Sequence, residues 1–315
     1  LRPGKASGER VWRLSHRLME LGYLQEADLS SDYNERTEEA VKAFQASVGL
    51  KPDGVVGTGT IAALDQSPRV GAASMRDSAA QMRALKAENI QDMLYVNLPS
   101  QTVTLVRGGQ FVLTMRAIVG RPSRETPLLR DKITHIIVNP TWTVPPTVLK
   151  EDKLPNLRKS GKPGVSNAAI FLDGEEVDPA IIDWNEVSPG RVRIVQSPGD
   201  HNALGRFRFN LTNRDSIYLH GTNEPHLFDR DIRAISSGCV RLQDARRLAE
   251  MLLAENGVGA EKVQRLMDTM TPQWVALSKP LPVRFTYWLA TVGDDDRVRV
   301  HPDVYERSDD AGGSA

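Results

Sequence analysis

The apolar and polar residues at the start of the chain follow the pattern of short amphipathic helices. Val11, Leu14, Leu18 and Leu21 recur every three or four positions, which puts them on one helix face. Gly22 follows directly as a stop signal. We therefore predict a first helix that ends near residue 21.

A second helix is predicted a little further along the chain. Val41, Phe44 and Val48 share one of its faces. Thr37 is the expected N-terminal cap, and Gly49 is the expected glycine after the last turn.

These helices belong to a small domain that precedes a linker. The turn 51–54 leads into a short third helix over 61–64, which completes an all-α three-helix unit. We bound this domain at 9–68. Residues 75–90 have helical composition, so we expect a helical linker over 69–92.

From residue 95 onward the apolar period changes to two, the period of β-strands. The clearest case is a hairpin over 103–119 that turns at Gly108-Gly109. Further strands are predicted at 134–138, 192–196, 207–211 and 216–220. Helices are expected over 242–252, with Asp244 at the N-terminus, and over 260–270. A closing hairpin is expected from 283–292 and 297–300, turned by 293–296.

The resulting fold class is α+β, with a mainly antiparallel, sandwich-like β domain over 93–305 and a mobile tail over 306–315. Inside the β domain, 145–191 is rich in Pro, Gly, Asn and charge and has weak periodicity. Short helices are expected there at 148–157 and 179–184. An irregular insertion of this length is often an active-site lid, and the alternative is a surface excursion without function.

Composition narrows the class of protein but not its function. The chain has 315 residues, 40% hydrophobic and 25% charged, with zero formal net charge. A balanced charge gives no support for a nucleic-acid partner. The first residue is Leu1 rather than Met, so we expect a processed or truncated chain whose signal peptide or N-terminal membrane anchor is missing.

Candidate chemistry centres on Cys239, the only cysteine of the chain. A lone thiol has no partner for an intrachain disulfide. His220 ends an alternating stretch upstream, and a thiol with a histidine from a nearby strand has the ingredients of a nucleophile and its base. The alternative is a buried cysteine that acts as a small hydrophobe.

The residues around this cysteine suit the same chemistry. A free thiol has a pKa of about 8.5 and needs a base near neutral pH. Ser237, Gly238 and Cys239 form a turn whose backbone N–H groups are expected to stabilise an oxyanion, which makes Gly238 a candidate oxyanion residue. Arg241 is expected to favour the thiolate or to order the substrate pocket.

Three other residues are candidates for substrate binding, each with a structural alternative. Tyr218 lies two positions before His220, so on a strand both side chains point to the same face. Tyr218 is therefore expected to line the donor pocket, and the alternative is that it packs in the core or on the sheet. Trp142 either lines a substrate groove or only packs against other side chains. Asn202 lies in a glycine-rich turn near the substrate or serves only that turn. No short metal-ligand spacing occurs, so no metal is expected.

The N-terminal motifs resemble the small helical peptidoglycan-binding domain over about residues 9–66. The resemblance implies that this domain docks onto cell-wall glycopeptide. The residues that carry it are 37–45, Gly49-Leu50, Asp53-Gly54, Gly57, Thr60 and Leu64.

The reactive motif resembles that of the cysteine L,D-transpeptidases of bacterial cell walls. Those enzymes carry a strand histidine and a Ser-His-Gly-Cys-hydrophobe-Arg motif, which His220-Gly221-Thr222 and 236–241 match. Ser237 stands where many members have a second histidine. The subgroup with a wall-binding domain and a long capping insertion commonly has Ser-Ser-Gly-Cys, so the resemblance is to that subgroup.

The resemblance implies a two-step acyl transfer on peptidoglycan tetrapeptide stems. Cys239 attacks the carbonyl of the third-position diamino acid, His220 is general base and acid, and the Gly221 carbonyl orients the histidine. An acceptor stem amine then captures the thioester, which cross-links two diamino acids. Arg241, Ser237, Tyr218, Trp142 and Asn202 are the expected substrate contacts.

Two alternatives remain open at this point. Water as the acceptor would make the protein an L,D-carboxypeptidase, and an inert site would leave a wall-binding protein. The resemblance also implies an exported, periplasmic or cell-envelope protein, no cofactor, a monomer, and inhibition by carbapenem β-lactams.

Overall fold

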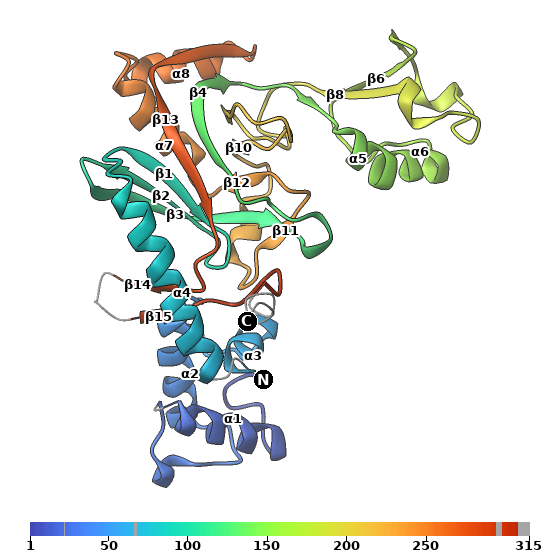
Figure 1. The fold of residues 1–315 in the computed structure, drawn as a ribbon. Helices are drawn as coiled ribbons and strands as arrows, with labels where there is room; N and C mark the ends of the chain where they lie inside the picture. Colours follow the sequence, from blue (N-terminus) through green and yellow to red (C-terminus); the bar gives the residue numbers. More distant parts are fainter. Residues whose placement is uncertain (22, 66–67, 294–297, 308–315) are drawn as a thin grey trace, which may run out of the picture.

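The computed structural model describes residues 1–21, 23–65, 68–293 and 298–307. Three parts are visible in Figure 1: a helical domain, a β domain above it and an arm that projects from the β domain. The predicted α+β class is confirmed. The expected stop at Gly22, the turn residues 294–296 and the tail from 308 lie outside the described residues.

The N-terminal domain contains the three predicted helices, α1 (Glu9–Glu20), α2 (Glu35–Ser47) and α3 (Thr58–Asp65). Their apolar faces meet in one core that includes Val11, Leu18 and Phe44. The predicted cap of α2 is wrong. Asn34 is the cap and accepts a hydrogen bond from the Thr37 N–H, while Thr37 is a buried residue of the first turn.

A buried glutamine explains several motif residues of this domain. The Gln45 amide donates to the Val55 carbonyl and to Thr60 Oγ1, and its oxygen accepts from the Gly54 N–H. One side chain therefore ties α2 to the following turn and to α3. A buried amide needs all these partners to avoid a desolvation penalty.

The helical domain is joined to the β domain by more than its chain connection. Helix α4 (Pro68–Ala87) runs from one to the other beside a small hairpin of β14 (Ala290–Val292) and β15 (Val298–Val300) (Figure 1). His301 is buried after β15 and lies against Gly49. Within the described residues, no helix combines the length and apolar character needed to cross a bilayer.

The β domain is a nine-stranded sheet in the order β11-β3-β12-β10-β9-β4-β13-β1-β2. An additional β2–β3 pairing joins the last strand of this order to the second, so eight strands form a closed ring around the largest apolar core. The strands are β1 (Met93–Asn97), β2 (Thr102–Arg107), β3 (Gln110–Gly120), β4 (Arg130–Val138), β9 (Phe207–Asn210), β10 (Leu219–His220), β11 (Ala234–Ser236), β12 (Val240–Leu242) and β13 (Gln273–Thr286).

Most pairings are antiparallel, as predicted, and three are parallel: β1–β13, β10–β12 and β3–β11. Helices α7 (Ala245–Ala254) and α8 (Ala260–Asp268) also match the prediction. Asp244 caps α7 by accepting from the Arg247 N–H.

Two predicted strands differ from the structure. The strand expected over 216–220 is reduced to β10, because Ser216 has a left-handed φ of 57° that interrupts extended backbone. The strand expected over 283–292 is divided. Its first part ends β13 at Thr286, and its last part is β14, which pairs with β15 outside the main sheet.

The segment 145–191 is more ordered than the predicted irregular insertion, because together with its flanking strands it forms a folded arm. Four strands form its sheet: β5 (Trp142–Thr143), β6 (Ala168–Leu172), β7 (Glu175–Glu176) and β8 (Val192–Gln196). A continuous helical segment combines α5 (Pro146–Val148), a π-helical turn at Leu149–Lys153 and α6 (Leu154–Ser160).

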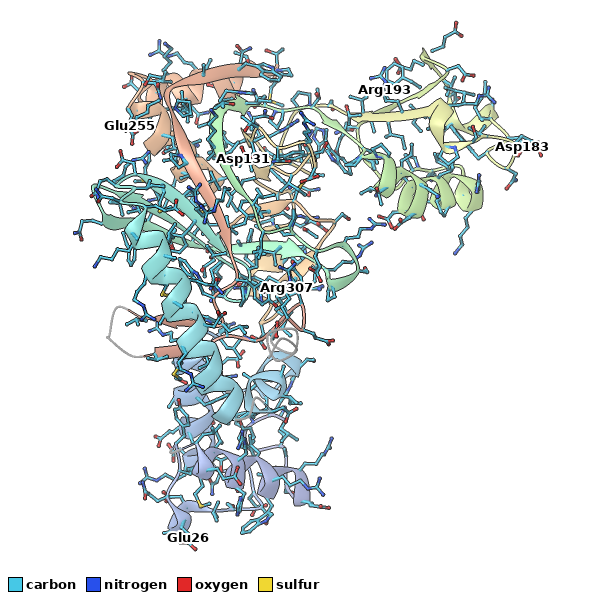
Figure 2. The ribbon with its side chains drawn as sticks, in the orientation of Figure 1. Glu26, Asp131, Asp183, Arg193, Glu255 and Arg307 are labelled. Carbon is cyan, nitrogen blue, oxygen red and sulfur yellow. The ribbon has the colours of Figure 1, made fainter. Side chains whose placement is uncertain are left out.

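The arm also has a hydrophobic core of its own, which includes Leu154, Leu157 and Trp184. Only a 3-10 turn at Pro179–Ile181 forms where a helix over 179–184 was expected. Figure 2 labels Asp183 and Arg193 on this arm, well away from Asp131 in the β domain. The arm therefore folds around its own apolar residues and projects from the ring of strands.

Candidate active site

A cavity of about 840 Å³ lies where the arm meets the β domain. Its walls come from β9, β10, the turn before β12 and the first part of the arm. Six of the predicted site residues line it: Trp142, Tyr218, His220, Ser237, Cys239 and Arg241.

The parallel pairing of β10 with β12 brings the candidate nucleophile and base together. In the register His220 is opposite Arg241, and the Val240 N–H donates to the Tyr218 carbonyl at 3.2 Å. This register makes Tyr218 level with Cys239. Neighbouring strands lie about 4.8 Å apart, so side chains on the same face of both strands contact one another.

The surroundings of His220 set its tautomer and its charge. Its Nδ1 lies 2.6 Å from the Gly221 carbonyl oxygen, which can only accept, so Nδ1 carries the proton. Burial, and next the positive charge of Arg241, lower the pKa of His220 to about 3. The ring is therefore neutral near pH 7, and Nε2 has a free lone pair.

The thiol of Cys239 is also neutral in this state. Cys239 is half-buried, and its Sγ lies 3.7 Å from the Ser216 carbonyl oxygen. Burial raises the pKa of Cys239, while the Tyr218 N–H and the charge of Arg208 act in the opposite direction. The free protein thus holds a neutral thiol and a neutral imidazole in one cavity, not a preformed ion pair.

The turn that carries Cys239 is fixed by its own backbone contacts. Ser236 Oγ donates to the Cys239 carbonyl at 2.6 Å and accepts from the Gly238 N–H at 3.1 Å. This engages the Gly238 amide that was expected to face an oxyanion. Among the described residues, the Cys239 N–H makes no hydrogen bond, so it is available as a donor.

A buried threonine supports the same turn from the other side. Thr126 Oγ1 donates to the Gly238 carbonyl at 2.7 Å and accepts from the Gly120 N–H at 2.8 Å. A Cβ on Gly120 would lie 2.2 Å from the Arg124 carbonyl oxygen. The loop after β3 therefore needs glycine at position 120 to approach the turn.

We expect Gly238→Ala to lower activity at least ~100-fold, because small displacements of reacting atoms are costly. Gly238 has φ 114°, a conformation that L-residues rarely adopt, and a new Cβ would lie 3.4 Å from Ile217 Cδ1. The turn would have to shift, and Cys239 with it. The control is Gly257→Ala, which changes a positive-φ glycine with open space around it. It should lower the melting temperature without lowering kcat, and equal activity losses in both variants would contradict the prediction.

The other predicted contacts divide into two groups. Arg241 lines the cavity and pairs with Glu224 at 2.9 Å, and Trp142 is half-buried in the cavity wall on β5. Asn202 is fully buried, and its amide donates to the Pro140 and Ser197 carbonyls. Asn202 therefore serves the turn, the structural alternative for this residue, and does not reach the cavity.

An arginine that the sequence did not single out connects the arm to the turn that carries Cys239. Arg124 Nη1 donates to Ser237 Oγ at 3.0 Å and to Asp152 of the arm at 3.1 Å, and Nη2 pairs with Glu151. Its side chain is only 10% exposed. Charged hydrogen bonds at this burial hold partners firmly, so Arg124 fixes the arm beside Cys239.

Arg124→Gln should lower kcat/KM about 10-fold and loosen the arm, because one side chain positions both Ser237 and the helical segment 146–160. Hydrogen exchange across 146–160 should rise in the variant. The matched control is Arg191→Gln, which removes an exposed ion pair with Asp173 inside the arm. An Arg124 variant with wild-type kcat/KM would show that this contact does not position the turn.

Three residues of this site were missed from the sequence: Arg124, Thr126 and Arg208. Arg208 lines the cavity from β9, with its guanidinium carbon 4.0 Å from the centre of the Tyr218 ring. Alternation over 207–211 puts Arg208 on the opposite face from Phe207, which is the one signal that could have indicated it. The two loop residues carry no such pattern.

Comparison with known proteins defines the class of the chain. A family described as "L,D-transpeptidase catalytic domain" matches residues 91–297, and one described as "Putative peptidoglycan binding domain" matches 7–64. The chain therefore belongs to the L,D-transpeptidase family. It is 36% identical over 217 residues to a protein of Haemophilus influenzae named "Putative L,D-transpeptidase", covering 67% of this chain and 44% of that protein. The chain thus spans under half the length of this relative.

Solved structures of L,D-transpeptidases are also similar, at low identity. One is from Xylanimonas cellulosilytica, with 17% identity, a TM-score of 0.25 and coverage of 91% of this chain and 97% of that one. Another, L,D-transpeptidase 3 from Mycobacterium tuberculosis with a faropenem-derived adduct, has 13% identity and a TM-score of 0.29. The match covers 62% of this chain and 60% of the M. tuberculosis chain.

Proposed function

We propose that this protein is an L,D-transpeptidase that cross-links peptidoglycan stem peptides through a thioester on Cys239. One observation carries the proposal. A neutral His220, with Nδ1 held by the Gly221 carbonyl at 2.6 Å, shares a cavity with the Cys239 thiol. A fixed imidazole with a free Nε2 is suited to take the thiol proton.

The first step is acylation by the donor stem. Cys239 Sγ attacks the carbonyl of the third-position diamino acid while His220 Nε2 takes the thiol proton. The oxyanion accepts a hydrogen bond from the Cys239 N–H. The C–N bond then breaks, and His220 returns the proton to the amine of the departing D-amino acid.

The second step transfers the acyl group. The side-chain amine of an acceptor stem attacks the thioester and gives a proton to His220. The C–S bond breaks, a new amide forms, and the sulfur regains the proton. The product joins two diamino-acid residues, and no cofactor takes part. Carbapenems would acylate the same sulfur.

The helical domain suggests where the reaction takes place. We propose that it docks on peptidoglycan in the cell envelope, supported by its family match over 7–64. Helix α4 and the packing of His301 against Gly49 would keep the docked domain at a fixed distance from the cavity.

The direct test is product analysis with disaccharide-tetrapeptides as both donor and acceptor. Mass spectrometry should find cross-linked dimers and free D-alanine in equal amounts. D-alanine without dimers, at any acceptor concentration, would identify an L,D-carboxypeptidase instead. The absence of both products, with no mass increase at Cys239 after carbapenem treatment, would leave the inert wall-binding alternative.

A further inference from the structure

Arg208 is a cation beside the reacting atoms that the steps above do not use. It lies on β9, and its side chain lines the cavity that contains Cys239 and His220. Its guanidinium carbon lies 4.0 Å from the centre of the Tyr218 ring, and Tyr218 is level with Cys239 in the β10–β12 register. The guanidinium is therefore one side chain away from the thiol.

Within the part of the chain that the structure describes, no carboxylate balances the charge of Arg208. Arg241, on the same cavity wall, pairs with Glu224 at 2.9 Å. Arg208 has no carboxylate oxygen within 4.0 Å among the described residues, and its side chain donates only to the neutral amide oxygen of Asn210, at 2.8 Å. The Nε atom of Arg208 is buried and has no hydrogen-bond partner among the residues that the structure describes. A half-buried cation with so few partners is costly unless a ligand supplies the negative charge.

We propose that Arg208 binds the terminal carboxylate of the donor stem peptide and so selects donors that end one residue after the attacked carbonyl. The inference rests on the function proposed above and names the part of the donor that this side of the cavity holds. The terminal carboxylate follows the attacked carbonyl by one residue, a separation of about 3.8 Å. The guanidinium above Tyr218 lies in the same cavity as Cys239 and close enough for its charge to act on the thiol, and its planar donors fit a carboxylate.

The same contact would help the reaction to proceed from the first step to the second. The carboxylate leaves with the D-amino acid, so the thioester no longer offers Arg208 an anion. A donor one residue longer would carry its carboxylate about 3.4 Å further along an extended chain, out of reach of Arg208. Selection of the donor then depends on the position of its terminal charge.

The test compares two donors that differ only in that charge: the tetrapeptide stem and the same stem ending in a primary amide. Release of D-alanine or D-alaninamide is measured at several donor concentrations. The wild type should use the free acid about 10- to 100-fold better in kcat/KM, as expected for a charge-assisted hydrogen bond. Arg208→Gln should lose most of this preference, mainly through a higher KM for the acid donor, and Arg208→Lys should keep part of it.

The matched control is Lys153→Gln, which removes a cation from the arm side of the same cavity and should keep the preference. Equal losses for both donors in Arg208→Gln would mean a structural role and overturn the assignment. Loss of the preference in Lys153→Gln would mean that the preference comes from the summed positive charge around the cavity, and this would also overturn the assignment to Arg208. A wild type that uses both donors equally overturns the Arg208 assignment alone, whereas a wild type that releases product from neither overturns the proposed function with it.

Discussion

Cys239→Ala should lower the rate of dimer formation by about 10⁴-fold or more, because the thioester cannot form without Sγ. The fold should survive the change. The side chain is half-buried, and its polar contacts are weak: the Ser216 carbonyl lies 3.7 Å from Sγ, and the other contacts are with Tyr218. We expect the free energy of unfolding to change by less than about 1 kcal/mol. Single-turnover assays of D-alanine release, with urea denaturation of the same samples, measure both effects.

Cys239→Ser is the matched variant for this prediction. It keeps a nucleophilic atom in the turn but replaces a thiol by a hydroxyl, which His220 activates less readily because its ordinary pKa is far higher. We expect residual activity in Cys239→Ser that Cys239→Ala lacks, and a carbapenem mass increase in neither variant. Dimer formation by Cys239→Ala at the wild-type rate would exclude the thioester route.

Local patterns were sufficient to predict most elements of this chain, because each depends on neighbouring residues. The helix from Val41 to Val48 and the strand 207–211 follow directly from apolar spacing. The N-cap of that helix could not be predicted from spacing. Asn34 and Thr37 are both good N-cap residues, and the contact between them decides which one caps the helix. The arm was misread because its core residues are spread over short turns and strands.

The site was harder to predict where it depends on contacts between distant segments. Spacing marked His220 and Cys239 as partners, but the parallel pairing of β10 and β12 depends on how the nineteen-residue connection folds. No local pattern indicates that Ser236 Oγ takes the Gly238 amide, or that Arg124 reaches both the turn and the arm. These contacts follow from tertiary packing, which a single sequence does not reveal.

His220→Gln should lower kcat/KM by about 10²- to 10⁴-fold, the usual contribution of a general base. Glutamine keeps a donor that can reach the Gly221 carbonyl, but it cannot take a proton. In the wild type the low pKa of His220, about 3, keeps the base neutral throughout the range from pH 5 to 8. The wild-type pH profile of kcat/KM should therefore lack an acidic limb near pH 6.5. A limb at that pH, absent from His220→Gln, would contradict the low pKa.

Because of the same low pKa, His220 lowers the free energy of unfolding in acid. The unfolded chain takes up a proton at this histidine below about pH 6.5, whereas the folded chain does so only near pH 3. Stability is therefore present above pH 6.5 and is lost as the pH falls toward 3. Between pH 7 and pH 5 the histidine should account for about 2 kcal/mol of lost stability.

His220→Gln removes this titration, so it should lose about 2 kcal/mol less than the wild type between pH 7 and pH 5. Urea denaturation at both pH values measures the difference, and the buried His301 contributes equally to both proteins and cancels. The matched control is His226→Gln, an exposed histidine six positions further on, which should follow the wild type in activity and in acid sensitivity. If His220→Gln were as acid-sensitive as the wild type, the pKa of His220 would be the same in the folded and the unfolded chain, which would contradict the low pKa in the fold.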